Sequence, residues 1–266
     1  MLMEARKLLR FFLLSTKYNI KSAFEYKKSF ITQMVFMFIN NGFFLIFWLV
    51  VTGVGGENTA SIDMQQILYI WSIPTLAVGI SDFFFGGISK LNKYIISGEL
   101  DTYIIQPQNT IIAVATSKCS FAAAGDMLYG IVLGIYVSSK ILDFVLILFF
   151  AILGVIIFCS CTIIIRLLAI WVGDVDNVAQ VYENSLLITF MTYPEQIFGK
   201  ITKILMYTVI PAGYIVHMPI RFINQFNYSY LLIIIIATII LAIITNLIFN
   251  FALKKYESGN NIALRG

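Results

Sequence analysis

Long apolar runs separated by short polar stretches dominate the pattern of hydrophobic and polar positions along this chain. Five runs stand out: Phe30–Val54, Gln66–Ile88, Ile111–Val137, Phe144–Ile170 and Tyr230–Phe251. A helix needs roughly 20 predominantly apolar residues to cross the hydrocarbon core of a bilayer. Because lipid offers no partner for backbone N–H and C=O groups, a spanning segment must be a helix or part of a closed barrel. The runs are continuous and lack the alternation of barrel strands, so they predict transmembrane helices.

The stretch between the fourth and the last of these runs has a more mixed pattern. Its first part, Gly173–Tyr193, is amphipathic and begins with a dense group of polar residues. Its second part, Glu195–Pro219, is mostly apolar but is interrupted by Pro211, and proline breaks helices because it lacks a backbone donor. We expect one part to cross the membrane and the other to dip into it or lie along it.

Two registers remain open for this stretch. In the register we favour, Val178–Tyr193 is the fifth crossing and residues 194–227 form a re-entrant pair of short helices on the extracellular side. In the competing register, Ile197–Met218 crosses and the preceding segment lies on the cytoplasmic face. Both registers give six crossings. The predicted fold is therefore an all-α integral membrane protein with a six-helix transmembrane domain over residues 29–253.

The segment before the first run carries basic residues at helical spacing. Five of them follow one another at intervals of 4, 7, 4 and 7 residues, which places them within a stripe of about 60° at 100° per residue. This pattern predicts an amphipathic helix over residues 1–28 that lies in the membrane interface and faces anionic lipid. An ordinary juxtamembrane basic patch is the alternative. The five residues are Arg6, Arg10, Lys17, Lys21 and Lys28.

Basic residues also indicate the orientation, because cytoplasmic loops of membrane proteins carry an excess of Lys and Arg. They concentrate in the N-terminal segment, in the loop 88–110 and in the tail 254–266. The loops after the first and third runs contain Lys140 as their one base. We therefore expect a multi-pass protein of the cell membrane with both termini in the cytoplasm.

The composition supports a membrane protein and argues against several other classes. Hydrophobic residues make up 59% of the chain and charged residues 12%, with a mean hydropathy of +0.88, whereas soluble domains carry about 25% charged residues. The net charge of +4 reflects the loop asymmetry, so we expect no nucleic-acid partner.

The sequence offers no constellation for catalysis. Its one histidine, His217, cannot form a zinc site without further ligands, and there is no phosphate-binding G-x-x-x-x-G-K-[ST] loop. The pair Gly199-Lys200 is followed by isoleucine and lacks the upstream glycine. The sequence thus predicts a non-catalytic protein without a cofactor or metal site. The cysteines lie in apolar runs and are expected to be structural: Cys119, Cys159 and Cys161.

The apolar runs contain the ionisable residues Asp82, Lys118 and Asp126. A charge at mid-bilayer costs about 2.5–3.5 kcal/mol on insertion scales, so such groups normally face protein or water. Lys118 is close enough to a run end to snorkel, and Asp82 could lie near the cytoplasmic boundary. The three residues are candidates for a wet path between helices. A buried hydrogen bond that locks two helices together is the alternative.

The loop after the second run contains a distinctive motif. Residues Gly98-Glu99-Leu100-Asp101 are followed by an apolar stretch and Pro107. This run resembles the "GELD" loop of the six-span permease subunits of ABC-2-type exporters. Where that family often continues Leu-Leu-x-Pro, this chain has Ile104-Ile105-Gln106-Pro107, which is a conservative departure.

A second segment resembles the same family. Its Tyr-Pro-x-x-Ile-Phe/Tyr motif and the prolines that follow match Tyr193, Pro194, Ile197 and Phe198, with Pro211 and Pro219 downstream. The resemblance extends over nearly the whole chain, including the basic amphipathic start, which corresponds to the "elbow" helix of these permeases. It implies that the two proline-containing segments form extracellular re-entrant helices that gate the exit.

The resemblance also implies a division of labour. In such exporters a separate dimer of ATPase subunits binds ATP and pushes on a coupling helix in the first cytoplasmic loop of the permease, and two permease chains form the pathway. The expected contacts with the ATPase are Gly98, Glu99, Leu100, Asp101 and Pro107. The substrate would be amphipathic, a peptide, a drug or lipid-like. A membrane-embedded scaffold that recruits a cytoplasmic partner through the same loop is the alternative function.

Overall fold

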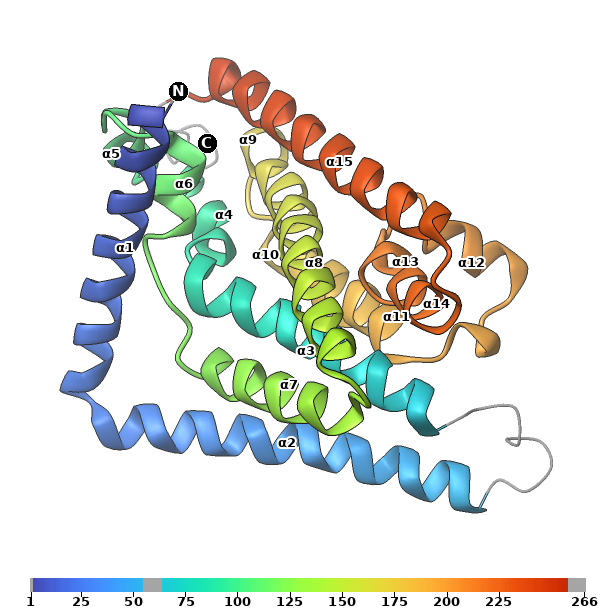
Figure 1. Cartoon of the computed structure of the whole chain (residues 1–266). Coiled ribbons are helices and arrows are strands. Elements are labelled where there is room, and N and C mark those ends of the chain that lie inside the picture. The colour runs from blue at the N-terminus through green and yellow to red at the C-terminus, as the bar shows by residue number, and fades with distance from the viewer. Residues whose placement is uncertain (1, 55–63, 258–266) are drawn as a thin grey trace.

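The computed structural model describes residues 2–54 and 64–257, and this part of the chain contains helices and turns but no strand (Figure 1). Four of its helices are long and apolar enough to cross a membrane, in agreement with four of the five predicted runs. The chain is therefore a multi-pass membrane protein. These four helices are α2 (Lys27–Val54), α3 (Met64–Phe85), α8 (Ile141–Leu167) with its short continuation α9 (Ala169–Val172), and α15 (Tyr228–Lys255).

The predicted third span, Ile111–Val137, is wrong as a single helix. The structure divides it into α6 (Thr110–Ala115) and α7 (Ala123–Val137). The intervening backbone bonds to another part of the chain instead of continuing the helix: the Gly87 N–H donates to the Ala115 carbonyl at 3.1 Å, and the Ser120 N–H donates to the Asp82 carbonyl at 3.0 Å. These long-range partners satisfy the backbone groups that a break exposes.

The favoured fifth span corresponds to a helical path that changes its winding. It consists of α10 (Asp176–Gln180), the π-helical segment η3 (Val181–Leu187) and α11 (Ile188–Thr192). The helix ends where Pro194 follows Tyr193, because the residue before a proline disfavours the helical conformation. Single π-helical turns occur frequently at functional sites, so η3 marks this segment for closer inspection.

The competing register, Ile197–Met218, is contradicted as a single spanning helix. A short turn of helix η4 (Glu195–Ile197) comes first, and the chain then forms three separate short helices. The break between the first two precedes Pro211, which cannot donate the hydrogen bond that a continuing helix requires. The three helices are α12 (Lys200–Leu205), α13 (Ala212–Ile215) and α14 (His217–Gln225).

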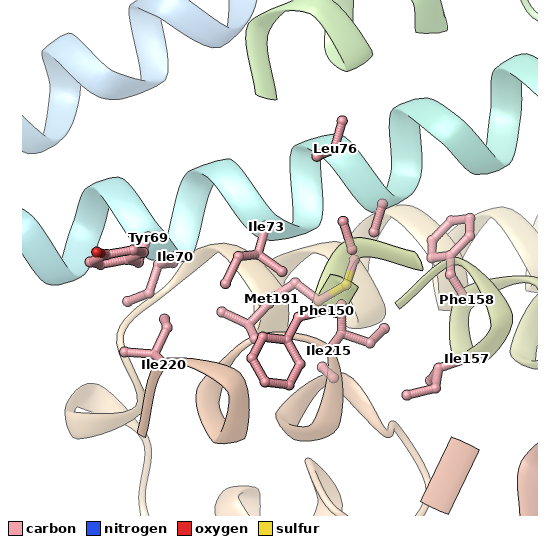
Figure 2. Close-up of a cluster of buried hydrophobic side chains, with 14 of the residues drawn as sticks. Tyr69, Ile70, Ile73, Leu76, Phe150, Ile157, Phe158, Met191, Ile215 and Ile220 are labelled. Carbon is pink, nitrogen blue, oxygen red and sulfur yellow. The ribbon is translucent and has the colours of Figure 1, made fainter. Parts of the chain in front are cut away.

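The core of the molecule surrounds α3. Within its 18-residue apolar window 78% of the residues are buried, against 11% in α2, so α3 is the central helix and α2 a peripheral one. Figure 2 shows Ile73 of α3 facing Phe150 of α8, with Met191 and Ile215 close by. All four side chains are buried, so the segment of Met191 (residues 188–192) and that of Ile215 (residues 212–215) both pack on the α3–α8 pair.

Glycines allow α3 and α7 to approach closely. A Cβ on Gly79 would lie 2.5 Å from the Met127 backbone nitrogen, and one on Gly130 would lie 2.7 Å from the Leu76 backbone nitrogen. Helices in lipid gain little from hydrophobic association and depend on tight packing of small residues. This paired use of glycine fixes α7 against the central helix, and Figure 1 shows α7 between α3 and α2.

The N-terminal helix α1 (Leu2–Glu25) confirms that most of the basic segment is helical, but it ends short of the predicted residue 28, and Lys28 of the predicted basic stripe lies in α2. The chain bends at Tyr26, and α1 then runs across the direction of α2 (Figure 1). Its contacts with the rest of the chain include Phe12, whose ring lies 5.8 and 5.7 Å from those of Phe84 and Phe85. Its position in the membrane interface stays a prediction.

Candidate functional site

Two predicted acids line neighbouring cavities along the central helix. The first cavity, of about 140 Å³, is bordered by Asp82, and the second, of about 210 Å³, by Asp126. Val78 and Ile188 border both cavities, so the two spaces adjoin. No base forms an ion pair with either acid within residues 2–54 and 64–257. The structure therefore places the two acids at adjoining cavities along α3.

The first cavity has polar walls within an apolar bundle. Ser81 and Asp82 come from α3, Thr162 from α8, and Glu183 and Asn184 from the π-helical segment η3. A polar group in lipid must find partners or water because an unsatisfied one is costly. The concentration of such groups from three elements makes this cavity a candidate for a hydrated path.

At the second cavity, Asp126 both forms a hydrogen bond between two helices and borders the open space. The side-chain amide of Asn41 in α2 donates to Oδ1 of Asp126 in α7 at 2.6 Å, so this acid does connect two helices. It also borders the cavity together with Trp71, Met191 and Thr192. Both hypotheses for Asp126 thus have a structural basis.

The structure separates Lys118 from the two acids. Its side chain is exposed, and it borders neither of the two cavities along α3. Lys118 lies in the break between α6 and α7 rather than within a helix. Its inclusion in the predicted path has no support in the described part of the chain.

Arg166 is a functional candidate that the sequence interpretation missed. The residue is 3% exposed, and its guanidinium donates two hydrogen bonds to the Glu183 carboxylate, from Nε to Oε1 at 3.0 Å and from Nη2 to Oε2 at 2.9 Å. Nη1 also donates to Oδ1 of Asp176 at 3.0 Å. Two-pronged bonds of this kind are the strongest charge-assisted ones. A base near the end of an apolar run, followed by acids in the next segment, was the signal available in the sequence.

This ion cluster continues into the loop that follows α3. That loop contains the short helical turn η2 (Ile88–Lys90) and α4 (Leu91–Ser97). The buried Asn92 of α4 donates to Oδ1 of Asp174 at 2.9 Å and accepts from the Val175 N–H at 3.4 Å. Hydrogen bonds from the Asp176 N–H, which has the larger effect, and from the Asn92 side chain lower the pKa of the Asp174 carboxyl group. A chain of hydrogen bonds therefore connects α4, through residues 174–176 and Arg166, with η3.

The predicted coupling motif forms a tight turn with one buried anchor. Gly98 has a φ of 76°, a left-handed conformation that glycine adopts without strain. Leu100 is fully buried, and its N–H donates to the Tyr94 carbonyl at 2.9 Å. Its neighbours face outward: Glu99 is exposed, and Ile105 is 83% exposed at the end of α5 (Asp101–Ile104). The loop thus exposes the acidic Glu99 and the apolar Ile105, while the buried Leu100 holds its backbone in place.

The two acids of the motif have different surroundings. Glu99 is exposed, whereas Asp101 is half-buried beside the Tyr256 hydroxyl at the end of α15. Burial and the Asp101 carboxylate together raise the pKa of Tyr256 to about 12. Asp101 therefore lies close to the C-terminal segment. Pro107 follows α5 and is exposed.

The predicted exit region begins with an aromatic contact to α2. The Tyr193 ring lies 5.9 Å from that of Phe44 and 5.7 Å from that of Trp48, both edge to face. The Phe198 ring lies 5.1 Å from that of Phe190. The other members of the predicted gate are dispersed: Pro194 precedes η4, Ile197 is 52% exposed, Pro211 precedes α13, and Pro219 is buried in α14.

Comparison with known proteins gives one match. A family model described as "ABC-2 family transporter protein" matches residues 34–260. The search of curated proteins gave no match, and neither did the search of solved structures.

Proposed function

The chain belongs to the ABC-2 transporter family, and from this premise we propose that it is the membrane subunit of an ATP-driven exporter. Members of this family are transport permeases that partner with ATPase subunits. ATP would bind to the separate ATPase dimer. The observation that carries the proposal is the bonded connection between the first cytoplasmic loop and the polar cavity beside Asp82.

The proposed topology keeps six crossings. The shorter pair consists of α6 with α7 and of α10, η3 and α11, which add to the four long helices. Helix α1 would lie in the interface as the elbow, and residues 194–227 would form the extracellular re-entrant region. An even number of crossings would place both termini on the same side of the membrane, and the excess of basic residues there would make it the cytoplasmic side.

The proposed contact with the ATPase is the outward face of the coupling loop. Glu99 is exposed, and Ile104 and Ile105 are 39% and 83% exposed. Exposed apolar side chains beside a charge are typical of a protein interface with an apolar centre and a polar rim. Leu100, Gly98 and the Asp101–Tyr256 contact would instead hold the loop rigid, so that a push on the loop moves α4.

The network around Arg166 provides a route from that push to the pathway. Movement of α4 would pull on Asp174 through Asn92, and the clamp of Arg166 on Asp176 and Glu183 would pass the displacement to η3. A π-helical segment can return to regular α-helix with a small shift in hydrogen bonding, which makes it a suitable moving part. Because Glu183 borders the first cavity, the shift would reshape the space beside Asp82.

A second permease chain would complete the pathway. The second cavity is bordered by Asn40 and Asn41 of α2, and α2 exposes Phe36 and Phe43 at 68% and 66%. Another copy, or a related chain, could pack on this aromatic surface and close the path. An amphipathic, peptide, drug or lipid-like substrate fits walls that combine polar and aromatic groups.

Paired substitutions at equally exposed isoleucines test the proposal. Ile105 and Ile141 are 83% and 86% exposed, but only Ile105 lies in the coupling loop. In the reconstituted complex with its ATPase, Ile105→Asp should reduce both transport and substrate-stimulated ATP hydrolysis, whereas Ile141→Asp should leave both near normal. Normal activity of Ile105→Asp would remove the coupling contact from this loop. A complex that hydrolyses ATP but transports nothing would favour the scaffold function instead.

A further inference from the structure

A polar pocket in the region after Pro194 stands apart from the cavities along α3. Its volume is about 220 Å³, and it lies between the start of α3, α12 and α14. Lys203 and Arg221 border it together with Glu195 and His217. The amide side chains of Gln66 and Asn224 also border it. The pocket thus gathers charged and hydrogen-bonding groups from segments far apart in the chain.

The ionic groups of the pocket leave one positive charge over. Arg221 and Glu195 form an ion pair of 2.6 Å, and the Tyr207 hydroxyl also donates to the Glu195 carboxylate at 3.4 Å. Burial lowers the pKa of His217, whose Nε2 lies 3.0 Å from the Phe190 carbonyl oxygen, so this ring is neutral at pH 7. Lys203 is half-buried and forms no ion pair within residues 2–54 and 64–257.

Donors remain available around this charge. The ammonium group of Lys203 has three N–H bonds, and the guanidinium of Arg221 has five, of which Nη2 bonds to Glu195. Arg221 is 40% exposed along its side chain, so its outer N–H groups can reach a ligand. A planar guanidinium beside an ammonium and side-chain amides is the donor set that proteins use for phosphate oxygens.

We propose that this pocket binds a singly charged phosphate group. The charge of such a group equals the excess of one positive charge in the pocket. A phosphodiester carries one negative charge at neutral pH, because a phosphate monoester would ionise a second time at about pH 6. The phosphodiester of a phospholipid headgroup and a small soluble phosphodiester share this chemistry. The flank of the pocket favours the lipid, because Ile201 and Ile204, on the same helix as Lys203, are 78% and 64% exposed and could contact acyl chains. Bound phosphate would connect α12 to α14 and brace the re-entrant region.

Two lysines on one helix provide a matched test. Lys200 and Lys203 both belong to α12, but Lys200 is exposed and does not border the pocket. The full chain is placed in lipid nanodiscs that contain phosphatidylglycerol, and retained lipid is measured by native mass spectrometry. Lys203→Gln should weaken retention by at least about tenfold, since loss of a charge-assisted bond has roughly that effect. Lys200→Gln should retain lipid like the wild type, and Lys203→Arg should restore retention.

Two further arms identify the ligand. Diacylglycerol lacks the phosphate, so the wild type and the Lys203→Gln variant should retain it equally. Inorganic phosphate added to the nanodiscs should displace phosphatidylglycerol if the pocket recognises the free anion, and should not displace it if the acyl chains are needed. Equal retention of phosphatidylglycerol by the Lys203→Gln and Lys200→Gln variants, or equal retention of diacylglycerol and phosphatidylglycerol, would overturn the proposal. Neither result would bear on the exporter function.

Discussion

Removing the guanidinium of Arg166 should destabilise the membrane domain more than most single substitutions. In Arg166→Met, the Glu183 carboxylate loses two bonds of 3.0 and 2.9 Å at a site where its side chain is 12% exposed. Breaking a buried pair by deleting one partner typically costs about 3–5 kcal/mol, because the other charge stays buried without compensation. Asp176 adds little, because its side chain is 46% exposed and exposed pairs contribute about 0–1 kcal/mol.

The assay is thermal unfolding of the purified chain in detergent, combined with a double-mutant cycle. A loss of that size corresponds to a decrease of roughly 6–20 °C in Tm for a protein of this length. Arg166→Met with Glu183→Leu removes both charges and should recover most of the loss, since apolar replacement of a whole buried pair is often neutral. Asp176→Asn should change Tm by only a few degrees. A decrease of less than about 2 °C for Arg166→Met, or no recovery in the double variant, would refute the assignment of Glu183 as the partner.

Three other substitutions test separate parts of the structure. Gly79→Ala places a Cβ 2.5 Å from the Met127 backbone and should lower Tm, because a clash of this kind costs about 1–3 kcal/mol. The control Gly42→Ala has no described neighbour within 4 Å and should leave Tm unchanged. Equal Tm values for the two variants would argue against the close packing of α3 on α7. Asn92→Ala should leave ATPase binding intact but reduce substrate-stimulated hydrolysis in the reconstituted complex, and unchanged stimulation would exclude this route. Burial lowers the pKa of His217 below its ordinary 6.5, so the unfolded chain binds more protons than the folded chain, and stability should fall as pH drops below about 6.5. The His217→Gln variant should lose this pH dependence. A wild type whose stability does not change over this range would contradict a neutral buried ring.

Hydropathy alone identified the four long helices because their apolar runs need no information from the rest of the chain. Residues 98–101 were also accessible, since the left-handed φ of Gly98 is a local requirement of the turn. The break in the third run could not be predicted from the sequence. It depends on hydrogen bonds from Gly87 and to the Asp82 carbonyl, which come from a distant part of the sequence and leave the hydropathy of residues 111–137 unchanged.

The candidate site was only partly predictable for the same reason. Asp82 and Asp126 stand out as acids in apolar runs, and the structure places each at a cavity along α3. Lys118 looked similar in sequence, but the chain breaks there and its side chain is exposed. Arg166 escaped notice because it lies near the end of a run, where a base can snorkel to the interface. Its partner Glu183 becomes a neighbour only when the chain turns back at Gly173.

The most direct test of the proposed coupling mechanism is site-specific crosslinking from the loop that contains residues 98–107. A photo-crosslinking amino acid replaces either Ile105 or Ile141, which are similarly exposed, in cells that also produce the ATPase subunit. The account predicts a covalent adduct with the ATPase from position 105, with a yield that changes when a non-hydrolysable ATP analogue is added to the membranes. It predicts no adduct from position 141. An ATPase adduct from position 141, or none from position 105 while the two subunits still co-purify, would contradict it.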